Sequence, residues 1–253
     1  MFLSKINECR FLLVVITEMV LIGSCWSCGG RTIIHTGITD YDKKLLLDTH
    51  NKIRQVVAMG AVSGQPPASN MMELTWSDDL AREAQKWAMS CSPYIHDPSR
   101  HFHDSYVGQN LATKWTTRAP TTFYDMNPDW ITDALSKWFA EYVDYSFSGY
   151  GYGNAETGHY TQLIWAETTS VGCGYSYYLD TQKRYHKKYV CNYGPSGNVQ
   201  GEQPYEKGYP NCYRHRLEDS KSYRGLCEKS EKFNRHNDND NENFVYRFYN
   251  YLG

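Results

Sequence analysis

Several signatures of catalysis and of nucleic-acid or membrane binding are missing from this chain of 253 residues. It contains no Gly-x-Ser-x-Gly motif, no His-Glu-x-x-His motif and no pair of Cys-x-x-Cys motifs. These absences argue against a serine-hydrolase elbow, a helical zinc-protease centre and a thiolate zinc site. The chain has no block of lysines or arginines, and its formal net charge of −2 gives no support to nucleic-acid binding. Asn-x-Ser/Thr is also absent, so N-glycosylation is not expected.

The first 25 residues resemble a secretory signal peptide. Two basic residues precede an apolar stretch over 11–22, and small residues follow it. This stretch is shorter than the about 20 uninterrupted apolar residues that a membrane helix needs, and nothing later in the sequence predicts a membrane span. We therefore expect cleavage between residues 23 and 27 and an extracellular, secreted protein. Cleavage removes Cys9 and Cys25.

Six cysteines remain after that cleavage, an even number that fits an oxidising compartment. They are Cys28, Cys91, Cys173, Cys191, Cys212 and Cys227. On spacing alone, six cysteines allow 15 different pairings.

Apolar periodicity predicts three helices. The first runs from Asp40 to Ala61, and the second opens at Ser77, a residue type that favours the N-cap position. The third begins with Pro128 and carries Glu141 near its end.

A hairpin is predicted in the second half of the chain. Aromatic-rich segments at 175–179 and 183–190 indicate two strands joined by a polar break. If the turn centres on Gln182, Cys173 and Cys191 lie opposite one another, which suits a disulfide. Two unpaired core thiols are the alternative. Three helices around a hairpin indicate a mixed α and β domain, and strands sandwiched between helices are one reasonable packing.

Several longer motifs occur in order along the chain. They are His50 with Asn51, Pro-Pro-Ala-Ser-Asn-Met at 66–71, Gly-Gln-Asn-Leu-Ala at 108–112, Gly-His-Tyr-Thr-Gln-Leu-Ile-Trp at 158–165, and Tyr-Val-Cys-Asn-Tyr-Gly-Pro-Ser-Gly-Asn at 189–198. With these motifs the chain resembles the CAP superfamily: cysteine-rich secretory proteins, antigen 5 and plant pathogenesis-related 1 proteins. Within that superfamily it most resembles the arthropod antigen 5, or venom-allergen, branch.

The resemblance implies an α+β fold, a three-layer α/β/α sandwich with a broad cleft and a disulfide-stapled hairpin. It also implies the pairs Cys173–Cys191 and Cys28–Cys91, which leave Cys212 and Cys227 to close a small extension. The expected organisation is a signal peptide at 1–25, an irregular lead-in at 26–39, the CAP domain at 40–198, a cysteine-containing extension at 199–227, and a polar tail at 228–253 that we expect to be disordered.

The family cleft carries two histidines and two glutamates. By resemblance, His159 and Glu141 match two of them, and Gln109 stands where many members have glutamate. His103 fits the first histidine by its distance from the Gly-Gln-Asn segment, with His101 as the alternative. His103, His159 and Glu141 are thus candidate catalytic residues, and the two histidines are candidate ligands for Zn²⁺. The alternative is that His159 and Glu141 hydrogen-bond each other and only hold the loop against the helix.

The function that the resemblance favours is a secreted, non-enzymatic antigen-5-like protein of saliva, venom or haemolymph. It would bind an extracellular protein or a small lipid through its cleft and loops, with no cofactor required. One alternative is a lipid or sterol carrier, for which the candidate lining residues are Leu111, Trp115, Phe123, Tyr124 and Met126. The other is a metal-dependent hydrolase that uses the cleft histidines. Thr161, two residues from His159, is a hydroxyl candidate, although it more readily satisfies local backbone groups.

Overall fold

The computed structural model describes residues 27–28, 30–92, 94–101, 105–151 and 156–230. The predicted signal peptide, apart from its cleavage boundary, and the polar tail beyond residue 230 lie outside these ranges, as does His103. Within the described ranges, no helix is both long enough and apolar enough to cross a membrane.

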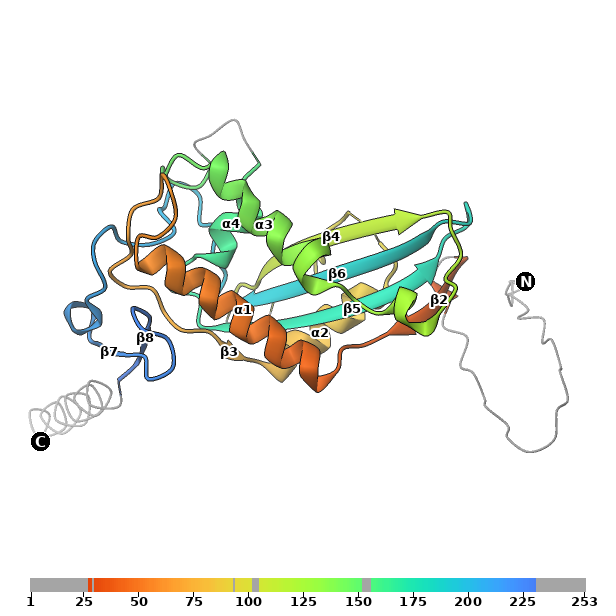
Figure 1. Cartoon of the computed structure of the whole chain (residues 1–253), viewed down its shortest axis with the longest axis horizontal. Helices are drawn as coiled ribbons and strands as arrows, with labels where there is room; N and C mark the ends of the chain where they lie inside the picture. Colours follow the sequence, from red (N-terminus) through yellow and green to blue (C-terminus); the bar gives the residue numbers. More distant parts are fainter. Residues whose placement is uncertain (1–26, 29, 93, 102–104, 152–155, 231–253) are drawn as a thin grey trace, which may run out of the picture.

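A sheet of six strands forms the middle layer of the molecule (Figure 1). Its strands are β1 (Ser27–Cys28), β2 (Arg31–Thr36), β3 (Thr75–Trp76), β4 (Gly108–Thr116), β5 (Ser170–Leu179) and β6 (Tyr185–Gly194). They lie in the order β1-β2-β5-β6-β4, and β3 pairs in parallel with β5. The other pairs in this sheet are antiparallel.

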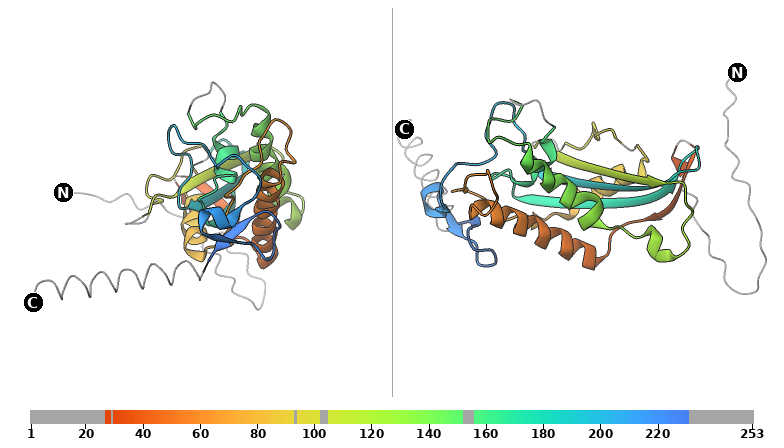
Figure 2. Two further views of the ribbon diagram at one scale, coloured as in Figure 1. Left: turned by 90° about the vertical axis from the view of Figure 1, so that its left-hand side faces the viewer. Right: turned by 45° about the horizontal axis from the view of Figure 1, so that its top comes forward.

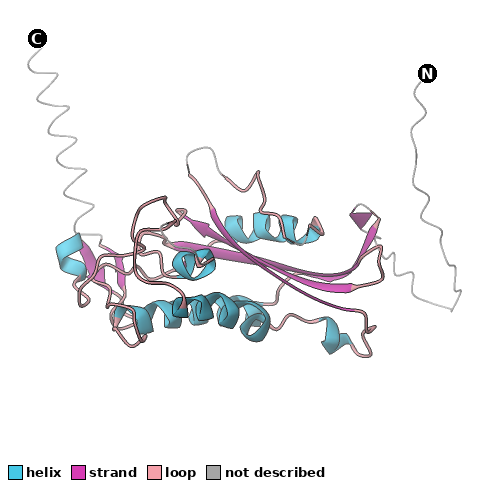
Figure 3. Cartoon of the chain, turned by 90° about the horizontal axis from the view of Figure 1, so that it is seen from above, coloured by secondary structure: helices cyan, strands magenta, loops and turns pink. Residues whose placement is uncertain are grey.

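Helices cover both faces of this sheet. They are α1 (Asp40–Ala58), α2 (Asp78–Met89), α3 (Ser136–Ala140) and α4 (Gly158–Leu163), with short helical turns η1 (Phe123–Met126), η2 (Ile131–Leu135), η3 (Glu141–Val143) and η4 (Cys212–His215). α2 lies alone on one face, while α1, α3 and α4 lie on the other (Figures 2 and 3). The predicted α/β/α sandwich is therefore confirmed.

The first helix begins where its sequence signals predict. The Thr39 side chain accepts a hydrogen bond from the Asp42 N–H, and the Asp42 carboxylate accepts one from the Thr39 N–H. The helix ends at Ala58 rather than at the predicted Ala61, because Gly60 takes the left-handed conformation with φ of +70°.

The third predicted helix exists, but it is not a regular α-helix. Its helical residues start at Trp130, two positions after the predicted Pro128, because Asp129 caps the first turn by accepting the Thr132 N–H at 3.1 Å. It then runs as the π-turn η2, α3 and the 3₁₀-turn η3, which ends at Val143.

The predicted hairpin is confirmed down to its register. Cys173 lies opposite Cys191 in the β5–β6 pair, and the two form a disulfide. The strands carry glycine where α2 crosses them closely. A Cβ atom on Gly174 would lie 2.4 Å from the backbone of Gln85, so only glycine permits this approach.

Two expectations about the flanking segments change: the irregular lead-in at 26–39, and the start of the polar tail at residue 228, which lies within a strand. Residues 26–39 were expected to be irregular, yet β2 pairs with β5 through its backbone, and its side chains alternate between half-buried and exposed positions. The extension forms a two-stranded sheet of β7 (Leu217–Asp219) and β8 (Cys227–Lys229). The Cys28–Cys91 and Cys212–Cys227 disulfides anchor these two segments, so all three implied pairings are confirmed.

Candidate functional site

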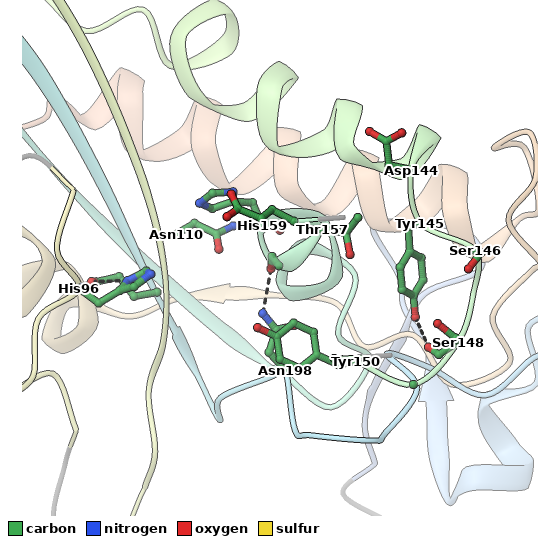
Figure 4. Close-up of a pocket in the computed structure, with 15 residues that line it drawn as sticks. His96, Asn110, Asp144, Tyr145, Ser146, Ser148, Tyr150, Thr157, His159 and Asn198 are labelled. Atoms are coloured by element: carbon green, nitrogen blue, oxygen red, sulfur yellow. Dashed lines mark hydrogen bonds between the residues drawn. The ribbon is translucent and has the colours of Figure 1, made fainter. Parts of the chain in front are cut away.

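A cavity of about 570 Å³ opens at the end of the sheet where β4 begins and α4 lies; we call it the cleft. Its walls include Gln109, and they also include His96, Asn110, His159 and Asn198 (Figure 4). These residues come from four separate segments of the chain, and tertiary contacts bring them together.

His159 is held by the carboxylate of Glu141. One carboxylate oxygen lies 2.6 Å from the His159 Nδ1 atom, and the other accepts the backbone N–H groups of His159 and Tyr160, both at 3.0 Å. Glu141 therefore caps the first turn of α4 from the neighbouring helical segment, as well as orienting the imidazole. The hydrogen bond between these two side chains, predicted from the sequence as the alternative to a catalytic role, is present.

The other side of His159 is equally constrained. The indole of Trp138 stacks on its ring, with centroids 6.0 Å apart and planes 17° from parallel. Asn110 donates from Nδ2 to the His159 carbonyl at 3.1 Å. Nδ1 is engaged by Glu141, and the other ring nitrogen, Nε2, has no hydrogen bond to a described residue.

A buried network behind the cleft connects it to α1. The Asn110 amide also reaches the Tyr193 hydroxyl at 3.4 Å, and that hydroxyl lies 3.0 Å from the His50 Nε2 atom. The His50 Nδ1 atom lies 2.7 Å from the Leu46 carbonyl, so Nδ1 carries the proton and Nε2 accepts. Burial lowers the pKa of His50 to about 4, which keeps this ring neutral.

The facing wall is built around His96 and Gln109. The Gln109 Oε1 atom accepts from the His96 ring at Nδ1 and from the Asp97 N–H, both at 3.0 Å. Its amide nitrogen donates to the Asn192 Oδ1 atom at 2.9 Å. Because Oε1 can only accept, His96 must carry its proton on Nδ1, which leaves Nε2 with a lone pair. Burial lowers the pKa of His96, so this tautomer persists at neutral pH.

The sequence identified Glu141, His159 and Gln109, which all lie at this site, but it missed His96. That residue is 13 positions before Gln109, in a loop without apolar periodicity. No signal in the sequence marks it, because its partner contact at Gln109 is completed by the backbone N–H of Asp97, which any residue except proline supplies. The predicted His103 lies outside the described residues. Its alternative, His101, does not line the cleft.

The Thr161 hydroxyl is engaged in structural hydrogen bonds. Its hydroxyl lies 2.7 Å from the Asn198 Oδ1 atom and 3.1 Å from the Thr157 carbonyl. As expected, it satisfies local groups.

The described side chains do not by themselves fit a zinc site. Zinc sites in proteins take three or four protein ligands. The cleft offers His96 and His159, while the oxygens of Glu141 and Gln109 are engaged in the contacts above. Within the described ranges, no three histidine, cysteine or acidic side chains are close enough together to hold a metal ion.

The five candidate lipid-lining residues do not share one cavity. Leu111 packs against α2 with Val190. Trp115, Phe123 and Tyr124 are exposed, the last by 82%. Met126 packs against the core on the opposite face from α2.

Comparisons with known proteins agree with the fold. The model of the cysteine-rich secretory protein family, CAP, matches residues 47–193. Salivary antigen-5 of Dipetalogaster maximus is 41% identical over 216 residues, which are 82% of this chain and 83% of that protein. Venom allergen 5 of Vespula flavopilosa is 41% identical over 190 residues, or 71% of this chain and 87% of that one. The crystal structure of NaASP2 with Zn²⁺ has a TM-score of 0.61 and 25% identity, and covers 76% of this chain and 97% of its own.

Proposed function

We propose that this chain, which belongs to the cysteine-rich secretory protein (CAP) family, is secreted and binds an extracellular ligand in the cleft without converting it chemically. Its relatives include antigen 5 proteins of saliva and venom, which supports an extracellular site of action. The three disulfides support the same compartment.

The observation that carries the proposal is the way the cleft is built. Its volume of about 570 Å³ is typical of cavities that bind small molecules or a protruding side chain. The Nδ1 atoms of His96 and His159 are held by Gln109 and Glu141, while their two Nε2 atoms remain available to a ligand. Such fixed polar groups reduce the entropy lost on binding.

The same geometry disfavours hydrolysis. A nucleophilic mechanism needs a hydroxyl or thiol within hydrogen-bond reach of a base. Neither cleft histidine makes such a contact with a described residue. A serine–histidine contact does occur outside the cleft, between the Ser69 Oγ and His215 Nε2 atoms at 3.1 Å. Ser69 is only 5% exposed there, so a substrate has no access to it.

The charges around the cleft restrict the ligand. Asp144 and Glu156 are among the residues that line it, and none of the described lining residues is a lysine or an arginine. A neutral or cationic group therefore fits this wall better than an anion does.

Native mass spectrometry of the secreted protein tests the proposal, as purified and after incubation with the small-molecule and protein fractions of plasma. The cleft is blocked by Ser146→Trp at an exposed lining position, and Ser136→Trp on the exposed face of α3 is the matched control. We expect a stoichiometric adduct on the wild type and on the control, but not on the blocked variant. An equal adduct on all three proteins would place binding elsewhere. Substrate turnover that His159→Ala abolishes would make the protein an enzyme.

A further inference from the structure

A second cavity, of about 220 Å³, lies at the opposite end of β4 from the cleft. β4 has nine residues, so roughly 27 Å separates its two ends. Figure 1 shows this end of the strand at the edge of the sheet farthest from α4. The loop that follows β4 forms the outer wall through Arg118, Ala119 and Pro120.

Aromatic rings line this cavity. Tyr177 and Tyr185 stack with their centroids 5.9 Å apart and their planes 16° from parallel. Trp115 lies beside them and is 50% exposed, which is unusual for a side chain of this size. Tyr177 is only 3% exposed, so the rings of Trp115 and of the partly buried Tyr185 provide the surface on which a planar ligand can stack.

Positive charge gathers in the same place. Lys114 and Lys187 are paired directly across β4 and β6, an arrangement of like charges that destabilises a sheet. Asp133 compensates Lys114 at 2.9 Å. Lys187 donates to the Asn127 carbonyl at 2.7 Å, but no described carboxylate lies within ion-pair distance of it. Burial lowers the pKa of Lys187 and the neighbouring Lys114 also lowers it, while the carboxylates of Asp133, Asp129 and Asp125 offset part of this shift.

The loop adds a third cation, Arg118, whose guanidinium forms no ion pair with a described residue. The acidic residue in the lining, Asp125, is engaged in its own turn, where it accepts hydrogen bonds from Thr121 and Thr122. Arg118 and Lys187 thus have no described carboxylate within ion-pair distance, in a cavity whose walls are aromatic, and the carboxylate of Asp125 is the one negative group among its described lining residues.

We propose that this basic aromatic cavity, defined by Trp115, Tyr177, Tyr185, Lys114, Arg118 and Lys187, binds a small planar aromatic anion. The ring of the ligand lies against the aromatic side chains, and its acidic group pairs with Lys187 and Arg118. The volume of about 220 Å³ is below that of ordinary drug-sized pockets and limits the ligand to one or two rings. A long acyl chain does not fit within it. The alternative is a solvated charged surface, on which the stacked tyrosines only complete the core and Lys187 only donates to the Asn127 carbonyl.

Isothermal titration calorimetry with 2-naphthoate as the probe tests this site. The neutral 2-naphthamide reports on the role of charge, and octanoate reports on the role of the ring. The variants are Arg118→Gln and Lys187→Gln, with Lys137→Gln, an exposed cation on α3 outside the cavity, as the control of equal charge change. Thermal unfolding verifies that each variant is folded, and the exposed position of Arg118 keeps the test valid if Lys187→Gln is unstable.

We expect 2-naphthoate to bind with one-to-one stoichiometry, and 2-naphthamide to bind at least tenfold more weakly. Each cavity variant should raise Kd for 2-naphthoate by roughly tenfold, the loss of one charge-assisted hydrogen bond, while Lys137→Gln leaves it unchanged. Equal affinity for acid and amide would overturn the proposal, as would equal effects of Arg118→Gln and Lys137→Gln. Tighter binding of octanoate at the same residues would instead identify a fatty-acid site.

Discussion

Arg54 provides the sharpest test of how this fold is held together. It lies on α1, and its side chain is fully buried without a carboxylate partner in the described structure. Its guanidinium donates five hydrogen bonds to backbone carbonyls at 2.7–3.1 Å. The acceptors are the carbonyls of Met72, Leu163, Trp165, Ala166 and Thr168. Three of these belong to the end of α4 and the turn after it, so Arg54 fixes the helix that carries His159.

Replacing Arg54 by methionine leaves five carbonyls without their donor. At about 1 kcal/mol net for each hydrogen bond, the loss is roughly 5 kcal/mol. Part of it is offset, because burial disfavours the charged guanidinium and lowers its pKa to about 9. We therefore expect Arg54→Met to lower the free energy of unfolding by about 4 kcal/mol. Arg54→Lys keeps the charge and three donors, and should lower it by about 2 kcal/mol.

Urea unfolding followed by tryptophan fluorescence measures this series, with the disulfides intact. Arg82→Met is the control, because Arg82 lies on the exposed face of α2 and pairs only with surface carboxylates. Its unfolding free energy should stay within about 0.5 kcal/mol of the wild type. A loss below 1 kcal/mol for Arg54→Met would refute the reasoning, because it would mean that water or a repacked side chain satisfies the five carbonyls.

Three further outcomes follow from the packing and the titrating groups. Gly174→Ala should lower Tm by about 6 °C or more, since the added Cβ atom would meet the backbone of Gln85 at 2.4 Å. Gly194→Ala should change Tm little, because its Cβ atom would first meet a side-chain atom of Leu80 at 3.4 Å, and equal shifts of Tm for the two variants would contradict this reasoning. The pKa of His50 is about 4 in the folded protein and 6.5 in the unfolded chain, so the free energy of unfolding should fall by roughly 3 kcal/mol as pH drops from 6.5 to 4. Urea unfolding at several pH values should show this fall for the wild type and a smaller one for His50→Gln. In an NMR titration, Gln109→Glu should raise the pKa of His96 above 6.5 from its depressed value, and an unchanged midpoint would disprove their contact.

Local signals predicted much of this fold because they depend on few residues. The symmetry of Cys173 and Cys191 about Gln182 gave the hairpin register, and the polar side chain of Ser77 gave the start of α2. β2 was missed for the opposite reason. Its partner β5 begins about 140 residues later, and no pattern within 26–39 states that a strand there has a neighbour to pair with. The π-helical geometry of η2 was not predicted either, because no local sequence pattern marks it.

The site was predictable where a motif fixed the residue, as for His159 and Glu141. The His96 wall was not, because it depends on a loop that folds back so that one backbone N–H and one imidazole meet the same amide oxygen. Distance along the chain is a poor guide in such a loop, since its path is not set by helical or strand periodicity.

The glutamine at position 109 determines what kind of cleft this is. Its amide presents an acceptor to His96 and a donor to the Asn192 Oδ1 atom, and a carboxylate can supply only the first of these. With glutamate, a charged oxygen would face the Asn192 oxygen at the same distance of about 2.9 Å, at a position that is only 8% exposed. That repulsion is removed only if Asn192 turns its amide over and loses its bond to the Leu80 carbonyl. Glutamine avoids both penalties and removes one negative charge from the wall. The His96 and His159 imidazoles then face the cavity, and the carboxylate nearest to them, Glu141, is already engaged by His159 and by two backbone N–H groups, which favours recognition by hydrogen bonds over capture of a metal ion.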